Sequence, residues 1–547
     1  MLALRGAGPL TVMEMEAPWN RRARRILVLL ALGALLLSGT AGALASGPGP
    51  VAPHGNGGLP PTRASTLSGV LEPVHWTHPT ASSPPTLISS TPAPDQVLHV
   101  LVTLQYTHRQ TLHWLLSQLS NPSSPDHHHY LTAAEFDAEF SPSPSTYSGL
   151  IRYVEREGGT AVQTFSDRAS LAFNASLPAL STMFHTNFAD YRRGATPFVA
   201  PTAAPSLPSS LAMAVASVSG LDTDPLLTAH VDSRLSLVSP AGTVARHAPS
   251  TSGYLLPPTV KGVQYEYAPD FQVAYDEQSL FQQHGYPTTA VVATILWAGV
   301  NISGNPVGPF VPADVYSFYN ETLPAGVPHA HLVGVPIGGA AAPGNSASFD
   351  TTGANFENTL DLEMVGSTAP GATIYNVYGP SASFTNLNQA FATVLSPPSG
   401  DPGLNNVSVI SNSWGGAATN DTSWYHDLEQ AQARGITVLA SSGDSGDNPA
   451  SSKYVGTTVE IPSSQAYNTF GDVAVGGTTV TLTNGLTLAS QVAWNISSSD
   501  TADGGPAGST GGISSLFPEP SWQTASSANH WISGAGRGVP DLSAIAN

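Results

Sequence analysis

Cysteine is absent from the 547 residues of this chain. Its absence excludes a disulfide framework, thiolate catalysis and a cysteine-ligated zinc site. Charge is also scarce, because only 10% of the residues are Asp, Glu, Lys or Arg, against about 25% in a typical soluble domain. Few internal ion pairs are therefore available to be lost at low pH. This composition fits an acid-tolerant protein, and it fits a secreted protein without a pH preference equally well.

Positive charge is the scarcest kind, with 18 Lys and Arg against 37 Asp and Glu and a formal net charge of -19. Phosphate binding needs clustered cations, so no nucleic-acid partner is expected. The chain also lacks a phosphate-binding G-x-x-x-x-G-K-[ST] motif and an H-E-x-x-H zinc motif. The histidine run at 127–129 lacks the spacing of a ligand set, and we interpret it as a solvated loop.

Apolar runs of near-spanning length are missing except close to the N-terminus. There, Arg21, Arg22, Arg24 and Arg25 precede an apolar run over 26–37, and the small residues at 43–45 offer a cleavage site. Residues 1–45 are predicted to be a signal peptide, with a membrane anchor that leaves the rest outside as the alternative. Secretion is expected, and it agrees with six N-x-S/T sequons, at Asn174, Asn301, Asn320, Asn406, Asn420 and Asn495.

The rest of the chain changes character three times. Residues 46–64 are rich in Gly and Pro and are predicted to be a flexible leader. Residues 65–221 hold a strand-like run over 97–104 and helical patterns over 110–119 and 150–157, which together favour an α+β domain. Residues 222–262 lack clear periodicity and are predicted to be an exposed linker.

Residues 263–547 alternate between the two periodicities. Strands are predicted over 290–297, 372–378, 407–411 and 436–440, and helices over 360–364, 387–395 and 424–434. This alternation predicts a parallel sheet with helices on both faces. Ligand sites in such sheets lie beyond the carboxyl ends of strands, which are expected at Trp297, Tyr378, Ser411 and Ala440.

Acidic residues that could carry chemistry lie at two places, on a predicted helix and in the loop after a predicted strand. Glu357 and Asp361 are four residues apart and share one face of a helix, while Glu363 points elsewhere. A solvated acidic face is the usual interpretation, although no Lys or Arg lies nearby to neutralise the pair. Asp444 stands in the loop that follows the strand ending at Ala440. That loop could equally be a Gly-rich turn in which the Asp caps the next segment.

Seven short segments that include these acids follow one another in a recognisable order. They are Tyr267-Ala-Pro-Asp-Phe with Ala274-Tyr275, Glu357-x-x-x-Asp361-Leu-Glu363 with Ala369-Pro-Gly-Ala372, Ser411-Asn-Ser-Trp-Gly415, Ser442-Gly-Asp-Ser-Gly446, Val475-Gly-Gly-Thr478, Gly511-Gly-Ile-Ser-Ser-Leu-Phe-Pro518 with Pro520-Ser-Trp-Gln523, and Arg537-Gly-Val-Pro-Asp541. Together they resemble the sedolisin or kumamolisin family of serine-carboxyl peptidases. Upstream, Asn121-Pro-Ser-Ser-Pro-Asp126 with Tyr130-Leu-Thr132, and Val218-Ser-Gly-Leu-Asp222, resemble the activation prodomain of that family.

The resemblance implies a fold and a set of roles. It implies a subtilisin-like α/β peptidase domain over 263–547, with a parallel sheet and flanking helices, preceded by a ferredoxin-like α+β prodomain over 65–221. Glu357 would be the general base, Asp361 would orient and polarise it, and Asp444 would line the oxyanion hole. The implied activity is that of a secreted, acid-acting endopeptidase proenzyme that hydrolyses proteins or peptides. Its own prodomain would serve as intramolecular inhibitor and chaperone, and a monomer is expected.

The sequence departs from the family pattern at two places. Some relatives carry an acid on the first core strand, where this chain has Trp297. The family nucleophile lies in a Gly-Thr-Ser motif downstream of the Val-Pro-Asp segment, whereas these 547 residues contain Gly-Thr-Thr at Gly456 and Gly477 but no Gly-Thr-Ser. We therefore expect the nucleophile and the ligands of the family's calcium ion to lie beyond residue 547, and the peptidase domain over 263–547 to be C-terminally incomplete and inactive alone. The alternative is a catalytically inactive secreted binding protein that keeps the fold.

Overall fold

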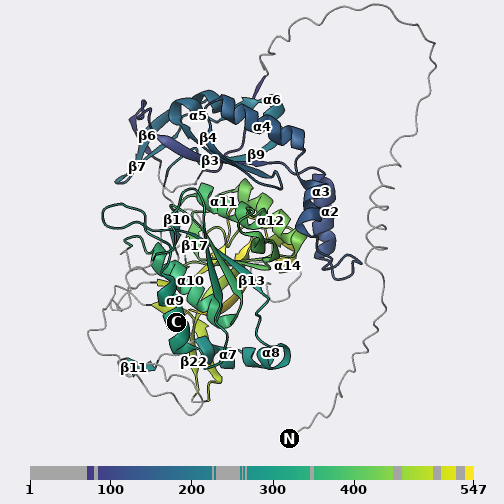
Figure 1. Cartoon of the computed structure of the whole chain (residues 1–547), viewed down its shortest axis with the longest axis vertical. Coiled ribbons are helices and arrows are strands. Elements are labelled where there is room, and N and C mark those ends of the chain that lie inside the picture. The colour runs from purple at the N-terminus through teal and green to yellow at the C-terminus, as the bar shows by residue number, and fades with distance from the viewer. Residues whose placement is uncertain are drawn as a thin grey trace, which may run out of the picture. The chain divides into compact units, whose positions relative to one another are not determined.

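The computed structural model describes residues 70–78, 84–224, 227–229, 259–260, 263–264, 268–344, 350–447, 459–483, 485–496, 507–524 and 536–546. The predicted signal peptide or anchor over 1–45 and the leader over 46–64 lie outside these ranges, as does most of the predicted linker. Within the described ranges, no helix combines the length and the apolar character needed to cross a bilayer. Leu67–Asn547 form one compact unit, which is shown in Figure 1.

The N-terminal part of this unit has a ferredoxin-like core. Its four-stranded sheet has the order β4-β5-β3-β9, and all neighbouring strands are antiparallel. In chain order the core elements are β3 (Val97–Leu104), α4 (Pro144–Arg156), β4 (Thr160–Thr164), β5 (Ser170–Ser176), α5 (Leu177–Phe184) and β9 (Val215–Ser219). The β-α-β-β-α-β sequence with this strand order confirms the predicted ferredoxin-like fold.

Local sequence explains where the helices of this part begin. Ser143 accepts a hydrogen bond from the Thr146 amide and precedes Pro144, the first residue of α4. Helix α3 (Ala133–Phe140) opens with a capping box between Thr132 and Glu135. Helices α2 (Arg109–Leu119) and α3 are inserted between β3 and α4. The residue pattern predicted α2 to within one residue, indicated only the second half of α4, and missed α3.

Smaller elements complete the N-terminal part. A second sheet of order β2-β6-β7 and the pair β1-β8 flank the ferredoxin-like core. The elements are β1 (Leu71–Pro73), β2 (Thr86–Ser89), β6 (Phe188–Arg193), β7 (Thr196–Pro201), β8 (Ser206–Pro208) and α6 (Ser209–Ala212).

The C-terminal part is built on an eight-stranded sheet of order β14-β15-β13-β16-β18-β22-β23, with β27 also paired to β22. All pairs are parallel except β22-β23. The strands are β13 (Val291–Trp297), β14 (His331–Pro336), β15 (Thr373–Gly379), β16 (Val409–Asn412), β18 (Thr437–Ser441), β22 (Val473–Leu482), β23 (Leu488–Ala493) and β27 (Leu542–Ile545). The predicted mixed α/β architecture with a large parallel sheet is confirmed.

Helices pack on this sheet in two apolar cores. The larger core joins α11 (Phe384–Leu395) and α12 (Thr422–Arg434) to strands such as β13 and β16. The smaller core joins α9 (Pro312–Thr322) and α10 (Ala354–Thr368) to Leu332 and Ile374. Two short helices, α7 (Ala268–Ala274) and α8 (Glu277–His284), precede β13. The residue pattern predicted α11 and α12 closely, because their apolar residues recur at helical spacing, but it indicated only five residues of α10.

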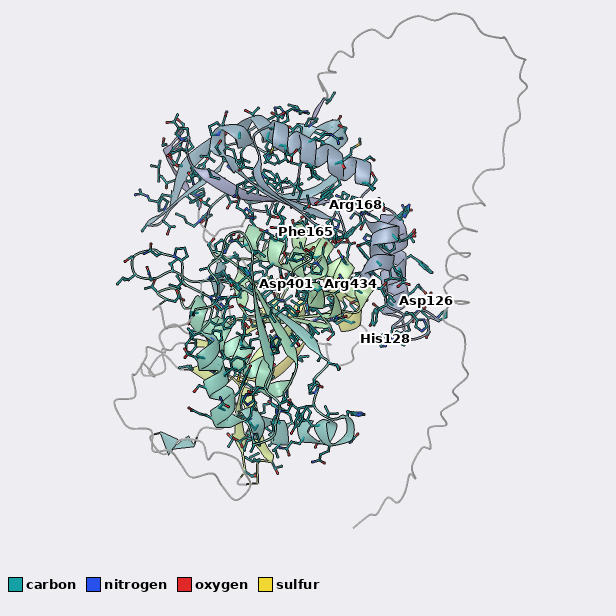
Figure 2. The ribbon with its side chains drawn as sticks, in the orientation of Figure 1. Asp126, His128, Phe165, Arg168, Asp401 and Arg434 are labelled. Atoms are coloured by element: carbon teal, nitrogen blue, oxygen red, sulfur yellow. The ribbon has the colours of Figure 1, made fainter. Side chains whose placement is uncertain are left out.

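The two parts meet along α11 and α12. All twelve residues of α11 are buried, because the helix packs on β13 and β15 and also on β3 and β5 of the N-terminal sheet. Helix α12 packs against α2 and α3, and His113 Nε2 donates to Glu429 Oε1 at 2.6 Å. Figure 2 labels Phe165 and Arg168 from the N-terminal part and Asp401 and Arg434 from the C-terminal part.

Candidate active site

Helix α10 presents the two acids predicted to share a face. Glu357, in its first turn, is 2% exposed, and Asp361, one turn later, is 8% exposed. Burial of both side chains shows that they do not form a solvated acidic face. Gly353 precedes the helix with a φ of 83°, a conformation that glycine adopts without strain. The positive end of the helix dipole lies at this turn and favours negative charge at Glu357.

Buried amides fix the start of α10 over the sheet. Asn358 donates to the backbone carbonyl of Trp297, the last residue of β13, at 3.0 Å. Asn376 on β15 donates to Asn358 Oδ1 at 2.8 Å and to Thr294 Oγ1 on β13 at 2.9 Å. Both asparagines are fully buried. This network places the acidic turn of α10 at the carboxyl end of β13, where a parallel sheet carries its sites.

Asp444 reaches the same place from a different strand. It lies in the loop between β18 and β19 (Ser445–Asp447), and it is half-buried. Its charge acts on Glu357, as does that of Asp361. The structure therefore brings together the three predicted site residues, although Asp444 is more than eighty positions from the others.

The pKa of Glu357 lies well above its usual range. Burial is the main cause, the charges of Asp361 and Asp444 add to it, and a hydrogen bond from Ser413 opposes it. The ordinary pKa of a glutamate side chain therefore cannot be used to argue that Glu357 acts as a base in acid. Two carboxyl groups buried side by side disfavour double ionisation, and this repulsion adds to the rise in the pKa of Glu357.

Ser413 is a site residue that sequence reasoning left without a role. Its hydroxyl donates to Asp361 Oδ1 at 2.6 Å, and its polar contact with Glu357 lowers the pKa of that carboxyl group. Ser413 lies between β16 and β17 (Trp414–Gly416). Its membership of the Ser411–Gly415 segment was the one signal in the sequence, because the contact with α10 spans 52 positions.

A short piece of the predicted linker lies beside this serine. The strand β10 (Leu227–Ala229) pairs antiparallel with β17, with Leu227 opposite Gly416 and Ala229 opposite Trp414. The Leu227 side chain is buried in the larger apolar core. The prediction that the whole linker is exposed is therefore wrong at Leu227.

Metal ligation finds no support in the described ranges, where no cluster of three or more His, Asp or Glu could hold an ion. The histidine run at 127–129 lies in the loop after α2, with His128 and His129 exposed. A calcium site remains a prediction from the family resemblance.

Fold and site together define an α/β protein that carries a ferredoxin-like N-terminal part and a buried carboxyl cluster at the carboxyl edge of a parallel sheet. Comparisons with known proteins show which proteins of this class the chain resembles. Residues 88–223 match the family model described as Pro-kumamolisin, activation domain. Kumamolisin from Bacillus sp. (strain MN-32) is 35% identical over 246 residues, which cover 42% of this chain and 40% of kumamolisin. The matched region thus spans two fifths of the length of that relative.

Sedolisin from Pseudomonas sp. (strain 101) is 24% identical over 474 residues, which cover 82% of this chain and 70% of sedolisin. The solved structure of Pseudomonas sedolisin complexed with two molecules of pseudo-iodotyrostatin has 24% identity and a TM-score of 0.36, and the match covers 51% of this chain and 70% of that one. The predicted resemblance to the sedolisin and kumamolisin family, with a pro-kumamolisin-type activation domain, is confirmed.

Proposed function

We propose that this chain belongs to a secreted, acid-acting serine-type endopeptidase proenzyme. The observation that carries the proposal is the cluster of buried Glu357 and Asp361 with half-buried Asp444 at the carboxyl edge of the sheet. In this proposal one carboxylate of the Glu357–Asp361 pair takes the proton of a serine hydroxyl, and protonated Asp444 donates a hydrogen bond to the developing oxyanion. The serine belongs to a Gly-Thr-Ser segment that these 547 residues do not contain.

Pairing of β10 with β17 supports a peptide substrate. Strand β17 directly follows Ser413, and it accepts an extended peptide segment through main-chain hydrogen bonds. That recognition mode suits any peptide backbone, whereas the buried Leu227 side chain adds apolar contact. In the proenzyme, the chain's own residues 227–229 would hold the position of a substrate and block it.

Several buried carboxyls support operation in acid. Burial raises the pKa of Asp167 and Asp421 to about 6 and that of Asp222 to about 7. Because these folded-state pKa values lie above the unfolded ones, the acids stabilise the fold fully below about pH 4. That contribution is lost as the pH rises through 6 to 7.

The test compares the 547-residue chain with the natural gene product that includes any downstream Gly-Thr-Ser segment. Hydrolysis of a denatured protein is followed from pH 3 to pH 8. We expect activity only in the longer product, with a maximum in acid. Glu357→Gln should lower its rate by roughly 10²-fold or more, and Asp444→Ala by roughly 10²- to 10³-fold.

Four results would contradict the proposal. A maximum near neutrality, or a near wild-type rate in either variant, would exclude the carboxyl mechanism. A folded longer product without any activity would instead favour the secreted binding protein. Hydrolysis by the 547-residue chain that Ser445→Ala abolishes would make Ser445 the nucleophile.

A further inference from the structure

A fourth carboxyl group lies next to the candidate oxyanion loop. Glu460 is fully buried, and its Oε1 accepts a hydrogen bond from the Ser445 hydroxyl at 3.3 Å. Ser445 directly follows Asp444 in the chain. Sequence reasoning did not single out Glu460, because it stands outside every motif and meets this loop only in space.

Glu460 also packs against the residue on the other side of Asp444. A Cβ atom placed on Gly443 would lie 3.0 Å from Glu460 Cδ and Oε1, and 2.9 Å from Thr510 Oγ1. With a φ of 106°, Gly443 adopts a backbone conformation that side chains rarely allow. The carboxyl group therefore touches both neighbours of Asp444 in a space that only glycine leaves open.

Strand β25 (Ala507–Ile513) holds the same three loop residues through their backbone. The Thr510 amide donates to the Gly443 carbonyl at 2.8 Å, and the Gly508 amide donates to the Asp444 carbonyl at 3.0 Å. The Ser445 amide donates to Thr510 Oγ1 at 2.8 Å. These bonds fix the loop from one side, and the Glu460 carboxyl group supplies the side-chain contact on Gly443 and Ser445.

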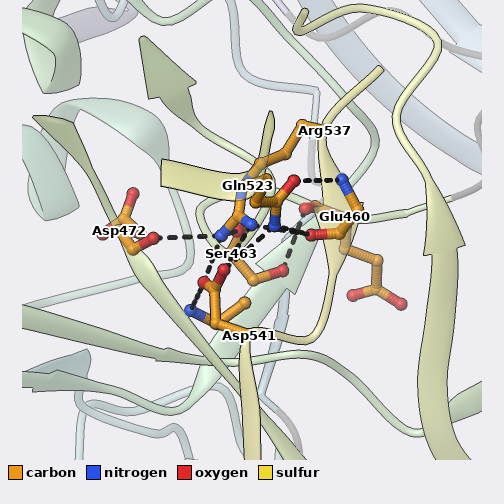
Figure 3. Close-up of polar contacts among 8 residues, drawn as sticks. Glu460, Ser463, Asp472, Gln523, Arg537 and Asp541 are labelled. Atoms are coloured by element: carbon orange, nitrogen blue, oxygen red, sulfur yellow. Dashed lines mark hydrogen bonds and ion pairs between the residues drawn. The ribbon is translucent and has the colours of Figure 1, made fainter. Parts of the chain in front are cut away.

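The segment that carries Glu460 is itself firmly anchored. Ile461 and Gly416, the last residue of β17, exchange backbone hydrogen bonds at 3.1 Å. On its other flank, the fully buried Arg537 donates to the carbonyls of Ser463 and Asp472 and pairs with Asp541 (Figure 3). The Glu460 side chain extends away from the Arg537 cluster (Figure 3). Hydrogen bonds thus connect the proposed peptide-binding strand β17, the Glu460 segment and the Asp444 loop.

We propose that Glu460 is a positioning residue that holds the Asp444 loop in register with the peptide-binding strand β17. This inference rests on the proposed function for the role of Asp444. The Ser445 hydroxyl is engaged with Glu460, so it serves the loop and is not turned toward Glu357 as a nucleophile would be. Removing the Glu460 contact keeps the Asp444 carboxyl group but lets its orientation vary. A misoriented hydrogen-bond donor stabilises the oxyanion less well, so the catalytic rate falls.

The first experiment measures amide hydrogen exchange in the 547-residue chain. Glu460→Ala should speed exchange of the Ser445, Gly508 and Thr510 amides by about tenfold, because a hydrogen bond to a carboxyl group stabilises the closed loop. Glu460→Gln keeps an acceptor oxygen and should restore slow exchange. Ser463→Ala, which removes a 3.1 Å hydrogen bond to the Glu460 backbone carbonyl, is the matched control and should leave these amides unchanged.

The second experiment measures kinetics in the natural product that includes the nucleophile segment. Glu460→Ala and Ser445→Ala should each lower kcat by about 10- to 100-fold with little change in KM, and the double variant should be no slower than either. Glu460→Gln should recover most of kcat. A serine-directed inhibitor should still label the Ser445→Ala variant.

The outcomes separate the two proposals. Unchanged exchange in Glu460→Ala, wild-type kcat in both single variants, or a Gln variant as slow as the Ala variant would overturn the positioning role. Loss of inhibitor labelling in Ser445→Ala would overturn it as well. The proposed function fails separately, if Glu357→Gln and Asp444→Ala keep wild-type rates.

Discussion

Replacing Asp167 by Asn should stabilise the protein at neutral pH and leave it unchanged in acid. Asp167 is buried at the contact with α12, and burial raises its pKa from 3.8 to about 6. Hydrogen bonds from the Ala169 amide, Gln430 and Ser396 oppose that rise, and the charge of Asp137 adds to it. Across the contact, the pKa of Asp427 is also raised, first by burial and then by Asp167.

The magnitude follows from the pKa of Asp167. A rise from 3.8 to about 6 corresponds to about 3 kcal/mol at about 1.4 kcal/mol per pKa unit. Below pH 3.8 the carboxyl group is neutral in both states and carries no penalty. Between pH 3.8 and 6 the unfolded chain loses its proton first, so the free energy of unfolding falls, and above pH 6 the full penalty remains. The Asn side chain keeps an acceptor for the Ala169 amide, which lies 3.1 Å from Asp167 Oδ1.

The assay is urea denaturation of the 547-residue chain at pH 4 and pH 7.5, followed by tryptophan fluorescence. Asp167→Asn should change the free energy of unfolding by less than about 0.5 kcal/mol at pH 4 and raise it by about 3 kcal/mol at pH 7.5. Asp95→Asn removes the same charge from an exposed position in the N-terminal part and serves as the control. A loss of stability of equal size at both pH values would refute the argument, because it would mean that hydrogen bonding by Asp167 outweighs its buried charge.

Two further predictions concern the contact between the parts and the segment that joins them. Burial raises the pKa of Glu429, but hydrogen bonds from His113 and His426 outweigh it and hold the pKa at about 2. Glu429→Gln should therefore cost up to about 3 kcal/mol above pH 4.5, and the cost should vanish as the pH falls through about 2; an equal cost at all pH values in urea denaturation would contradict this. Limited proteolysis, read by N-terminal sequencing of the fragments, should cut first between Asp222 and Gly262, and earlier cuts inside 65–221 or 263–547 would refute the predicted domain boundaries.

Sequence alone predicted the elements whose patterns are local. The apolar run over 97–104 became β3 without a change at either end, and the run over 290–297 became β13 with a loss of one residue. Helical spacing placed Glu357 and Asp361 on one face, and the common edge of parallel strands explains why the loop after β18 joins them. These rules depend only on backbone geometry, which the residue pattern indicates.

Contacts across the fold could not be predicted in the same way. Ser413 meets Asp361 over 52 positions, and His113 meets Glu429 over 316. No periodicity connects such residues, because their distance depends on how separate elements pack. The strand at Leu227 escaped notice for a related reason, since three residues without a pattern form a strand only when β17 is beside them.

Helix α11 determines which surface the C-terminal part would expose if the N-terminal part were removed. The helix lies between the N-terminal and C-terminal sheets. Its side that faces the N-terminal part nevertheless carries the side-chain amides of Asn388 and Gln389. Asn388 donates to Ser219 Oγ at 3.2 Å, and Gln389 donates to Gln163 Oε1 at 2.9 Å. Water can replace each of those partners, so this part of the surface would remain wettable once uncovered. In the proposed proenzyme, this face of α11 is thus suited to a contact that is broken irreversibly when the prodomain is released. Its exposed amides would then reduce aggregation of the released peptidase domain.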